Sequence, residues 1–402
     1  MNRKKIGPGV TSAILSLSLL TVMAGAAVAP ALNTIQEYFS GTNSMLVQMI
    51  ISIPALFIVI TSLVFPALCR KFGARTLLLA GLLLYTVGGC IAGLFSNIYL
   101  LLAMRALVGI GVGIVMPMST GLLAFYFEPS RQDRLMGYSS ALNQLGGSVA
   151  TLLSGLLATI TWRISFLVYL MGLISIVLTL IFMPNDNIGQ KKEKKEQNSG
   201  TFRTYYPFII AMFLLMFIFF IYPADFAIET AKEGVIPQSQ VAVIMALMDA
   251  LGFAGGLAYS ALGRRSGLRA KYVTPLLFLI SYALLAFVGG YFAAIVGSVL
   301  IGAGSGFGIP FLISTASKRA GKTAGTTVLP LISAALYLAQ FLTPVILSTV
   351  EAAFGGLGFL HLPYVTAVAV SVFFFVWQAV TIRSAKRASV EEKQETEERL
   401  AG

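Results

Sequence analysis

The stretch Arg70-Lys71-Phe72-Gly73-Ala74-Arg75 returns 194 residues later as Arg264-Arg265-Ser266-Gly267-Leu268-Arg269. A glycine-rich run returns in the same way, because Gly109-Ile110-Gly111-Val112-Gly113 is matched by Gly302-Ala303-Gly304-Ser305-Gly306 at an offset of 193 residues. Chance similarity between apolar helices could produce one such pair, but hardly two that are in register with each other. The repeated stretches therefore predict a chain built from two similar halves.

The composition predicts that most of the molecule faces lipid. Of the 402 residues, 57% are hydrophobic and only 11% are charged, and the mean hydropathy is +0.85. A soluble core cannot absorb so many long apolar runs, whereas about 20 consecutive apolar residues are enough to cross the hydrocarbon layer of a bilayer. We expect twelve spans, at 11–33, 44–68, 76–96, 98–125, 135–158, 163–183, 205–229, 238–262, 272–288, 291–316, 324–350 and 361–382.

The expected fold class is an all-α membrane protein with twelve transmembrane helices in two six-helix bundles that form a parallel repeat. Because six is an even number, both halves enter the membrane from the same side and are related by an axis along the membrane normal. The one long polar interruption lies near the middle of the chain and is rich in Lys and Glu. The expected division is an N-terminal bundle (1–183), a cytoplasmic linker (184–204), a C-terminal bundle (205–383) and a cytoplasmic tail (384–402).

The basic residues predict the orientation. Of the 28 Lys and Arg, 25 fall in the termini and in alternate loops, and only Arg105, Arg163 and Lys232 lie elsewhere. Basic loops stay on the cytoplasmic side, so we expect an integral, multi-pass protein of the cell membrane with both termini in the cytoplasm. The net charge of +12 is explained by this loop pattern and does not indicate a nucleic-acid partner.

Three short motifs occur in a characteristic order. Lys71-Phe72-Gly73 follows span 2, Arg105 precedes the glycine run of span 4, and Trp162-Arg163 opens span 6. In this order and spacing the chain resembles the major facilitator superfamily over nearly its whole length, and the loop from Glu128 to Gly137 resembles that of its proton-coupled drug-efflux branch. The resemblance implies a secondary transporter that moves a small organic compound by alternating access.

The chain also departs from the family pattern. The acid that usually precedes the basic residue of the loop motif is replaced by Arg70 in the first half and by Arg264 in the second. Span 5 lacks the Gly-Pro pair of the antiporter motif, and span 1 carries no acid in its middle. The predicted gating-loop residues are Arg70, Lys71, Gly73, Arg75, Arg264, Arg265, Gly267 and Arg269.

Two acids are the candidates for proton coupling. Asp249 lies near the centre of span 8, where desolvation favours the neutral carboxyl group, so that it could exchange a proton as access alternates. The other interpretation of Asp249 is a permanently protonated residue that packs helices together. Asp225 follows Pro223 in span 7 and is placed in the outer vestibule, whereas Glu229, on the same helical face, is expected to be solvated. His361, at the start of span 12, is expected to be interfacial.

Arg105 and three neutral polar residues are the candidates for substrate binding or charge relay. Arg105 lies about seven residues into span 4, where a charge is expensive. It either attracts an anionic substrate or relays the protonation of an acid, or it snorkels or ties helix ends together through backbone carbonyls. Asn143, Gln144 and Gln340 supply hydrogen-bonding groups inside spans, for which packing between helices is an equally good explanation.

The sequence gives no indication of an enzyme, a cofactor or a bound metal. It contains one histidine, no nucleophile paired with a base and no phosphate-binding loop, which argues against intramembrane catalysis and direct ATP drive. The leading hypothesis is a monomeric, proton-coupled exporter of amphipathic organic compounds. The alternatives are uptake or exchange of a small organic anion and, from another class, a membrane receptor that keeps the carrier fold without transport.

Overall fold

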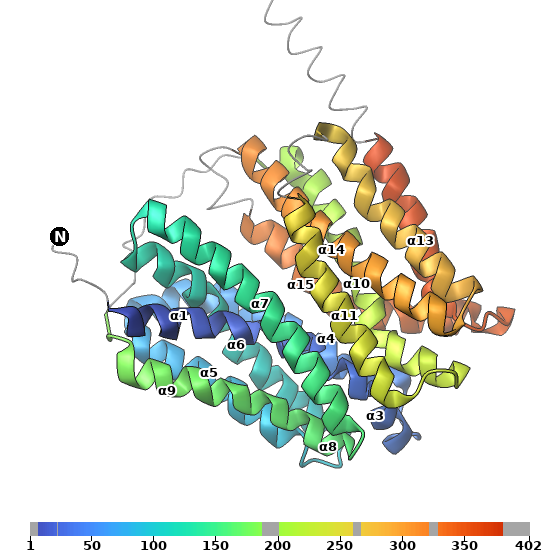
Figure 1. Cartoon of the computed structure of the whole chain (residues 1–402), viewed down its shortest axis with the longest axis horizontal. Helices are drawn as coiled ribbons and strands as arrows, with labels where there is room; N and C mark the ends of the chain where they lie inside the picture. The colour runs from blue at the N-terminus through green and yellow to red at the C-terminus, as the bar shows by residue number, and fades with distance from the viewer. Residues whose placement is uncertain (1–6, 22, 187–200, 260–266, 321–328, 381–402) are drawn as a thin grey trace, which may run out of the picture.

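The computed structural model describes residues 7–21, 23–186, 201–259, 267–320 and 329–380, and all its regular elements in these ranges are helices (Figure 1). The elements before residue 187 are α1 (Pro8–Thr21), α2 (Met23–Ala26), η1 (Ala29–Ala31), α3 (Leu32–Tyr38), α4 (Ser44–Lys71), α5 (Ala74–Ala92), α6 (Ile98–Tyr126), α7 (Pro129–Ala158), α8 (Trp162–Ser165), η2 (Phe166–Met171) and α9 (Gly172–Phe182). Those after residue 200 are α10 (Thr201–Glu233), α11 (Gln238–Ala258), η4 (Gly267–Tyr272), α13 (Val273–Phe287), α14 (Gly290–Ala320), α15 (Leu329–Phe354) and η7 (Gly355–Leu357), and a last helix spans Leu362–Val380.

Among the described residues, ten helices are long and apolar enough to cross a membrane. They correspond to ten of the twelve expected spans. Within the expected span 11–33, the regular α-helix ends at Ala26, before η1, where Pro30 lacks the N–H that would continue it. The expected span 135–158 lies inside α7, where the apolar stretch of the described residues is Leu145–Ala158. The number twelve stays a prediction.

Local sequence sets the starts of two long helices, α4 and α6. Asn43 caps α4 by accepting a hydrogen bond from the backbone N–H of Met45, and Asn97 caps α6 in the same way through Tyr99. The description of helix α10 runs from Thr201 to Glu233. The division into bundles, linker and tail stays a prediction.

The helices before and after the central segment gather in two groups, with α1 to α9 towards the lower left in Figure 1 and α10 to α15 towards the upper right. We call residues 7–186 the N-terminal half and residues 201–380 the C-terminal half. Helices α4 and α5 pack on α6 in the first, as α11 and α13 pack on α14 in the second. The halves meet where α7 packs against α11 and α4 against α15, which brings residues far apart in the sequence into contact.

Glycines allow α6 and α14 to approach their neighbours closely. A Cβ atom on Gly109 would lie closer than 3.0 Å to the carbonyl oxygen of Pro54 on α4, and one on Gly302 would meet the carbonyl of Met248 on α11 in the same way. Contacts shorter than 3.0 Å are ones that real Cβ atoms essentially never make. Only glycine fits these two positions without a shift of the helices.

Candidate functional site

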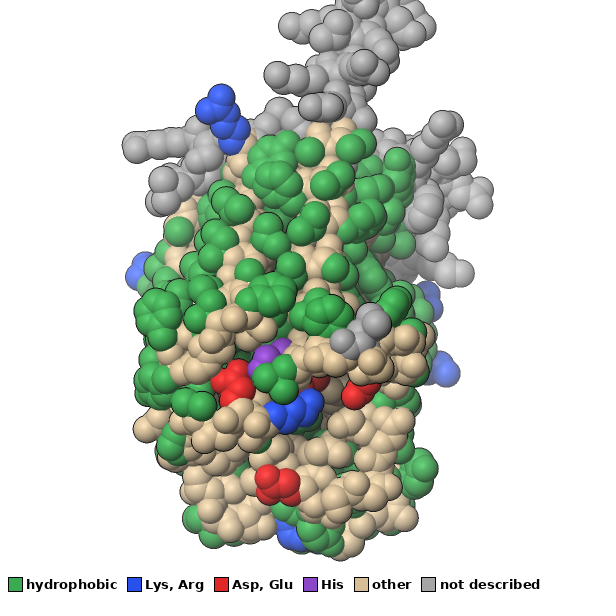
Figure 2. Space-filling view, turned by 90° about the vertical axis from the view of Figure 1, so that its right-hand side faces the viewer, with side chains coloured by type: hydrophobic (Ala, Val, Ile, Leu, Met, Phe, Trp, Pro, Cys, Tyr) green, Lys and Arg blue, Asp and Glu red, His purple; other side chains and the backbone are tan. Residues whose placement is uncertain are grey.

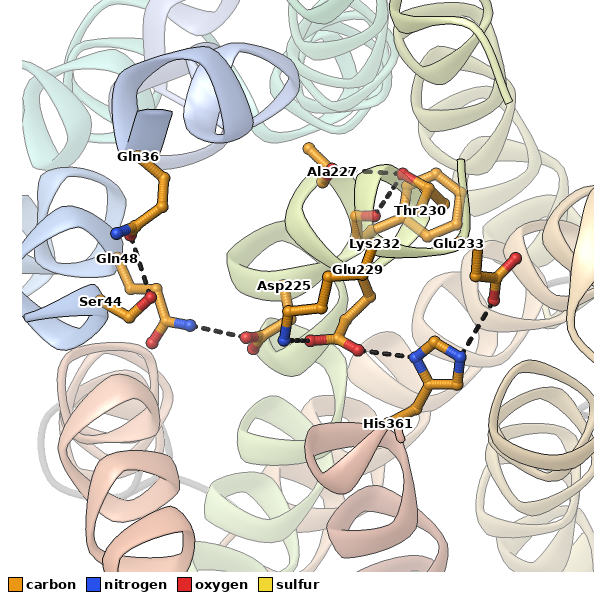
Figure 3. Close-up of polar contacts among 11 residues, drawn as sticks. Gln36, Ser44, Gln48, Asp225, Ala227, Glu229, Thr230, Lys232, Glu233 and His361 are labelled. Carbon is orange, nitrogen blue, oxygen red and sulfur yellow. Dashed lines mark hydrogen bonds and ion pairs between the residues drawn. The ribbon is translucent and has the colours of Figure 1, made fainter. Parts of the chain in front are cut away.

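Asp225 is buried at the contact between the two halves. Its carboxyl group, on α10, is 2% exposed and accepts a hydrogen bond from Nε2 of Gln48 on α4, with 2.6 Å between Oδ1 and Nε2 (Figure 3). The other oxygen, Oδ2, has no partner among the described residues. Gln48 is itself buried and comes from the N-terminal half, so this single bond joins residues 177 positions apart.

Asp249 makes a second contact between the halves. It lies on α11, is partly buried, and its Oδ2 accepts a hydrogen bond of 2.9 Å from the hydroxyl group of Thr151 on α7. Thr151 is 2% exposed and belongs to the N-terminal half. Both predicted coupling acids of the C-terminal half therefore bond to side chains of the N-terminal half.

A group of charged side chains surrounds Asp225 at the end of α10 (Figure 3). Oε1 of Glu229 pairs with Nζ of Lys232 at 2.6 Å, and Oε2 of Glu229 lies 2.7 Å from Nδ1 of His361. The other ring nitrogen of His361, Nε2, lies 3.3 Å from Oε1 of Glu233. We call Asp225, Glu229, Lys232, Glu233 and His361 the outer cluster.

The expectation that Glu229 lies on a solvated face is wrong. Glu229 is only 1% exposed, because the chain before the last helix folds back and places His361, itself 5% exposed, against it. The sequence signal for this burial was the spacing of Asp225, Glu229 and Glu233, which puts three acids on one face of an otherwise apolar helix. Sequence reasoning also missed Gln48 and Thr151, which no local pattern distinguishes from packing residues.

A cavity of about 130 Å³ opens beside the outer cluster. Its wall combines polar groups of α4, α10 and α15 with apolar side chains of the segment before the last helix, and its charged lining residues are Asp225, Glu229, Lys232 and Glu351. Figure 2 shows the histidine among acidic and basic side chains around a hollow, below a large apolar surface. An apolar surface of this kind is suited to contact with lipid, so the cluster lies towards one edge of the membrane-facing region.

Arg105 is completely buried in the N-terminal half. Its Nε donates to the carbonyl oxygen of Ile50 at 2.6 Å, its Nη1 to the hydroxyl of Tyr169 at 2.6 Å, and its Nη2 to the carbonyl oxygen of Ala24. The three partners lie on α4, η2 and α2, so Arg105 ties these elements to its own helix, α6. Of the roles expected for it, this geometry favours the tie through backbone carbonyls, and the substrate or relay role stays a prediction.

A model of the Major Facilitator Superfamily matches residues 14–344. The chain belongs to the major facilitator superfamily. It is therefore a multi-pass integral membrane protein of a transporter family. The fold is also similar to the crystal structure of a bacterial homolog to the human lysosomal transporter Spinster in an inward-facing and occupied conformation, with a TM-score of 0.73, 15% identity, and coverage of 94% of this chain and 96% of that one.

Two relatives are similar to shorter stretches of this chain. The Multidrug resistance protein B homolog of Mycobacterium tuberculosis (strain CDC 1551 / Oshkosh) is 36% identical over 121 residues, which are 29% of this chain and 22% of the relative. The Multidrug efflux pump SdrM of Staphylococcus aureus (strain N315) is 23% identical over 185 residues, 45% of this chain and 41% of the relative. The match thus spans less than half the length of either protein.

The basic loop typical of this superfamily lies against the end of the N-terminal half. Arg70 and Lys71 are exposed, Gly73 precedes α5, and Arg75 donates to the carbonyl oxygen of Leu180 at 2.5 Å. In the second loop Arg264 and Arg265 lie outside the described residues, Gly267 begins η4 and Arg269 is exposed. Their role in gating stays a prediction.

An acid from elsewhere in the sequence lies close to the first of these loops. The hydroxyl of Tyr126 donates to Oδ2 of Asp186 at 2.7 Å, and the backbone N–H of Ala74 donates to the carbonyl oxygen of Asp186 at 2.8 Å. Burial, and after it the hydrogen bond and charge of Asp186, raises the pKa of Tyr126 well above its usual range. Asp186 thus supplies a carboxylate beside a loop whose own motif lacks one.

The neutral candidates make contacts that suit packing. Oδ1 of Asn143 accepts from the hydroxyl of Thr21 at 2.7 Å, within the N-terminal half. Gln340, on α15, is buried and donates across the halves to the carbonyl oxygen of Ile51 at 3.3 Å. The side chain of Gln144 lies outside the described part of the structure. In that described part, no group of three or more His, Cys, Asp or Glu is arranged to hold a metal ion.

Proposed function

We propose that this protein is a proton-coupled secondary transporter that exports amphipathic small organic compounds. It would work by alternating access between two six-helix bundles, with twelve spans in all and both termini in the cytoplasm. The observation that carries the proposal is that Asp225 and Asp249 each bond to a side chain of the opposite half. A proton that binds either acid therefore acts directly on a contact that must change when the halves move.

The coupling follows from the strength of these two contacts in each protonation state. A hydrogen bond to an ionised carboxylate contributes about 1.5–3 kcal/mol, against about 1 kcal/mol for a neutral pair. Protonation of Asp225 weakens its hold on Gln48, and protonation of Asp249 weakens its hold on Thr151. Because a ligand shifts a two-state equilibrium only by its difference in affinity for the two states, this difference is what allows a proton to drive the conformational change.

The parallel repeat is supported by equivalent contacts in the two halves. Gly109 and Gly302 are equivalent at the offset of 193 residues, and the carbonyls they approach, those of Pro54 and Met248, are equivalent at the offset of 194. A second pair of glycines on α6 and α14, with the carbonyls that they approach, repeats at the same two offsets. Gly113 packs against the carbonyl of Ile58, and Gly306 against that of Gly252. Two glycines and their two acceptors thus repeat together.

The direction of transport and the substrate class are supported by the relatives. The two named above are a multidrug resistance protein homolog and a multidrug efflux pump, and amphipathic organic compounds are the substrate class that we carry over to this chain. The alternative substrate, a small organic anion, depended on Arg105. That guanidinium is fully buried and bonded to two helix carbonyls and a tyrosine, which gives the anion hypothesis no support.

The test is transport in proteoliposomes with an imposed pH gradient, using a panel of amphipathic dyes and, for comparison, small carboxylates. Wild type should accumulate dyes against their gradient. Asp249→Asn and Asp225→Asn should lose this accumulation by at least about tenfold, because a neutral amide cannot exchange a proton. Both variants should keep exchange of dye for dye, which needs the alternating scaffold but no proton.

The matched control is Glu351→Gln, which neutralises an exposed acid that lines the same cavity as Asp225. It should transport like wild type. Accumulation by Asp249→Asn and Asp225→Asn at the wild-type rate would overturn the coupling assignment. Inhibition of dye movement by carboxylates alone would favour the anion alternative, and binding of dyes without any flux would favour the receptor.

A further inference from the structure

His361 is the only histidine of the chain, and both of its ring nitrogens face carboxylate oxygens. Nδ1 lies 2.7 Å from Glu229 and Nε2 lies 3.3 Å from Glu233. Ionised carboxylates only accept hydrogen bonds, and a neutral imidazole has a single N–H to donate. Both contacts can therefore be favourable at the same time only when the ring carries two protons and a positive charge, as a hydrogen bond to Glu229 and an ion pair with Glu233.

The balance of charge among the four paired residues, Glu229, Lys232, Glu233 and His361, leads to the same protonation state. Glu229 and Glu233 contribute two negative charges, and Lys232, paired with Glu229, contributes one positive charge. A protonated His361 completes the balance, whereas a neutral ring leaves one excess negative charge beside a glutamate that is 1% exposed. An unbalanced charge at such a position is costly, because it has lost most of its water without gaining a partner.

The protonated ring would also link the last helix to α10. His361 precedes the last helix, and its two partners, Glu229 and Glu233, lie at the end of α10. Glu233 is also held from the other side, because its Oε2 accepts a hydrogen bond of 3.0 Å from the backbone N–H of Gly290, the first residue of α14. One proton on His361 thus supports the contacts between the start of the last helix and the end of α10.

We propose that His361, Glu229 and Glu233 form a proton-binding site at the outer face, whose occupancy determines whether the start of the last helix stays attached to the end of α10. The site is separate from Asp249, and it rests on the proposed orientation, with the end of α10 on the outer side. Protons reach it from the outer solution through the cavity, where Lys232 is 52% exposed.

The direction of the pH effect follows from the partners. Both links need the charged ring, so they are complete while the ring holds its second proton and are lost when that proton leaves. The weaker link is the 3.3 Å contact to Glu233, so this contact should be lost first. The other ionisable or charged neighbours are Asp225 and Lys232 on α10, Glu351 on α15 and Tyr364, whose ring stacks on His361.

The test uses the fact that ¹⁵N-labelled histidine marks a single site in the full chain, purified with a tag that contains no histidine and placed in lipid nanodiscs. The ¹⁵N signals of the imidazole distinguish the doubly protonated ring from the neutral ring directly. We expect a doubly protonated His361 at pH 6 and the neutral ring at alkaline pH. In Glu233→Gln the neutral ring should appear at a lower pH, while Glu351→Gln should titrate like wild type.

A second measurement follows the links themselves. Hydrogen exchange of the peptide that contains Tyr364 and Val365, whose backbone N–H groups donate to the carbonyl oxygen of His361, should be about tenfold faster at pH 8.5 than at pH 6 after correction for the intrinsic effect of pH, because the loss of about one charged hydrogen bond frees the start of the last helix. His361→Gln carries no titratable ring, so its exchange should be fast and independent of this pH step.

A neutral His361 at pH 6 in wild type would overturn the proposal, and so would a wild-type pH step in His361→Gln. Neither measurement requires substrate or flux. A failure here would therefore leave the proposed coupling through Asp225 and Asp249 intact, and a failure of that coupling would leave the proton site of His361 intact.

Discussion

The two halves share their glycine contacts but differ in their buried charges. At the offset of 193 residues the position of Arg105 is taken by Ser298, a buried serine that bonds to the hydroxyl of Tyr222 at 2.5 Å. At the offset of 194 the position of Asp249 is taken by Ala55 in the N-terminal half. The scaffold is thus repeated while the charges are not.

The difference lies in what holds each charge. Arg105 bonds to backbone carbonyls and a tyrosine within its own half, and carbonyls cannot gain or lose a proton under ordinary conditions. Asp225 and Asp249 bond to side chains of the other half. A charge fixed to its own half stabilises one rigid body, whereas a charge that bridges the halves responds to their separation. We infer that the first maintains the scaffold and that the other two operate it.

The largest effect should come from removal of the fixed charge. Arg105→Met leaves the carbonyls of Ala24 and Ile50 without their buried donors, which should lower the free energy of unfolding by about 3 kcal/mol. Ser298→Ala, at the equivalent position, should lower it by only about 1 kcal/mol. Unfolding by SDS in mixed micelles measures both. A stable Arg105→Met variant that no longer transports would instead assign Arg105 to the substrate or to the relay.

The next effect tests whether the halves are equivalent scaffolds. Gly113→Ala and Gly306→Ala each place a methyl group against a neighbouring helix, and each should cost about 1–3 kcal/mol. The matched control is Gly256→Ala, whose Cβ would meet the carbonyl oxygen of Gly306 at an ordinary 3.6 Å and should be neutral or slightly stabilising. A cost in one half alone would break the comparison, since the repeat predicts similar losses in both.

More of the fold than of the candidate site could be predicted from the sequence, and the reason is physical. Long apolar runs and repeated glycines are local properties of the sequence, and ten expected spans have matching long helices. In the span that begins at 11, the regular α-helix ends at Ala26, before Pro30, whereas the span that begins at 135 lies inside the longer helix α7. Helical spacing placed Asp225 and Glu229 on one face of a helix. The hydropathy pattern could not show which side chains cover that face.

The partners of the candidate acids could not be predicted, because they come from distant segments. Gln48 and Thr151 contact acids that lie 177 and 98 residues away, and nothing in their own neighbourhoods marks them. The burial of Glu229 likewise depends on His361, which is 132 residues away. Such pairs are set by how whole helices pack, so they become visible only in the folded chain.

A smaller effect should follow when the hydrogen bond between Gln48 and Asp225 is removed. Gln48→Leu keeps the size of the side chain but removes the donor to Asp225, which should favour separation of the outer ends by about 1.5 kcal/mol, roughly tenfold in population. A cysteine at Ser44, which lines the cavity, should then react about tenfold faster with a thiol reagent in a background without Cys69 and Cys90. Unchanged reactivity would mean that Asp225 does not hold this end closed.

The smallest effect should come from Thr151→Val, which removes the hydroxyl bonded to Asp249 and keeps the shape of the side chain. Because Asp249 itself remains able to bind a proton, pH-driven accumulation should continue at a rate reduced by about threefold, as expected for the loss of roughly 0.7 kcal/mol. Thr151→Ser should restore the wild-type rate, since it returns the donor. If Thr151→Val instead behaves like Asp249→Asn, the bond rather than the proton carries the coupling, and the bridging acids would be structural ties of the same kind as Arg105.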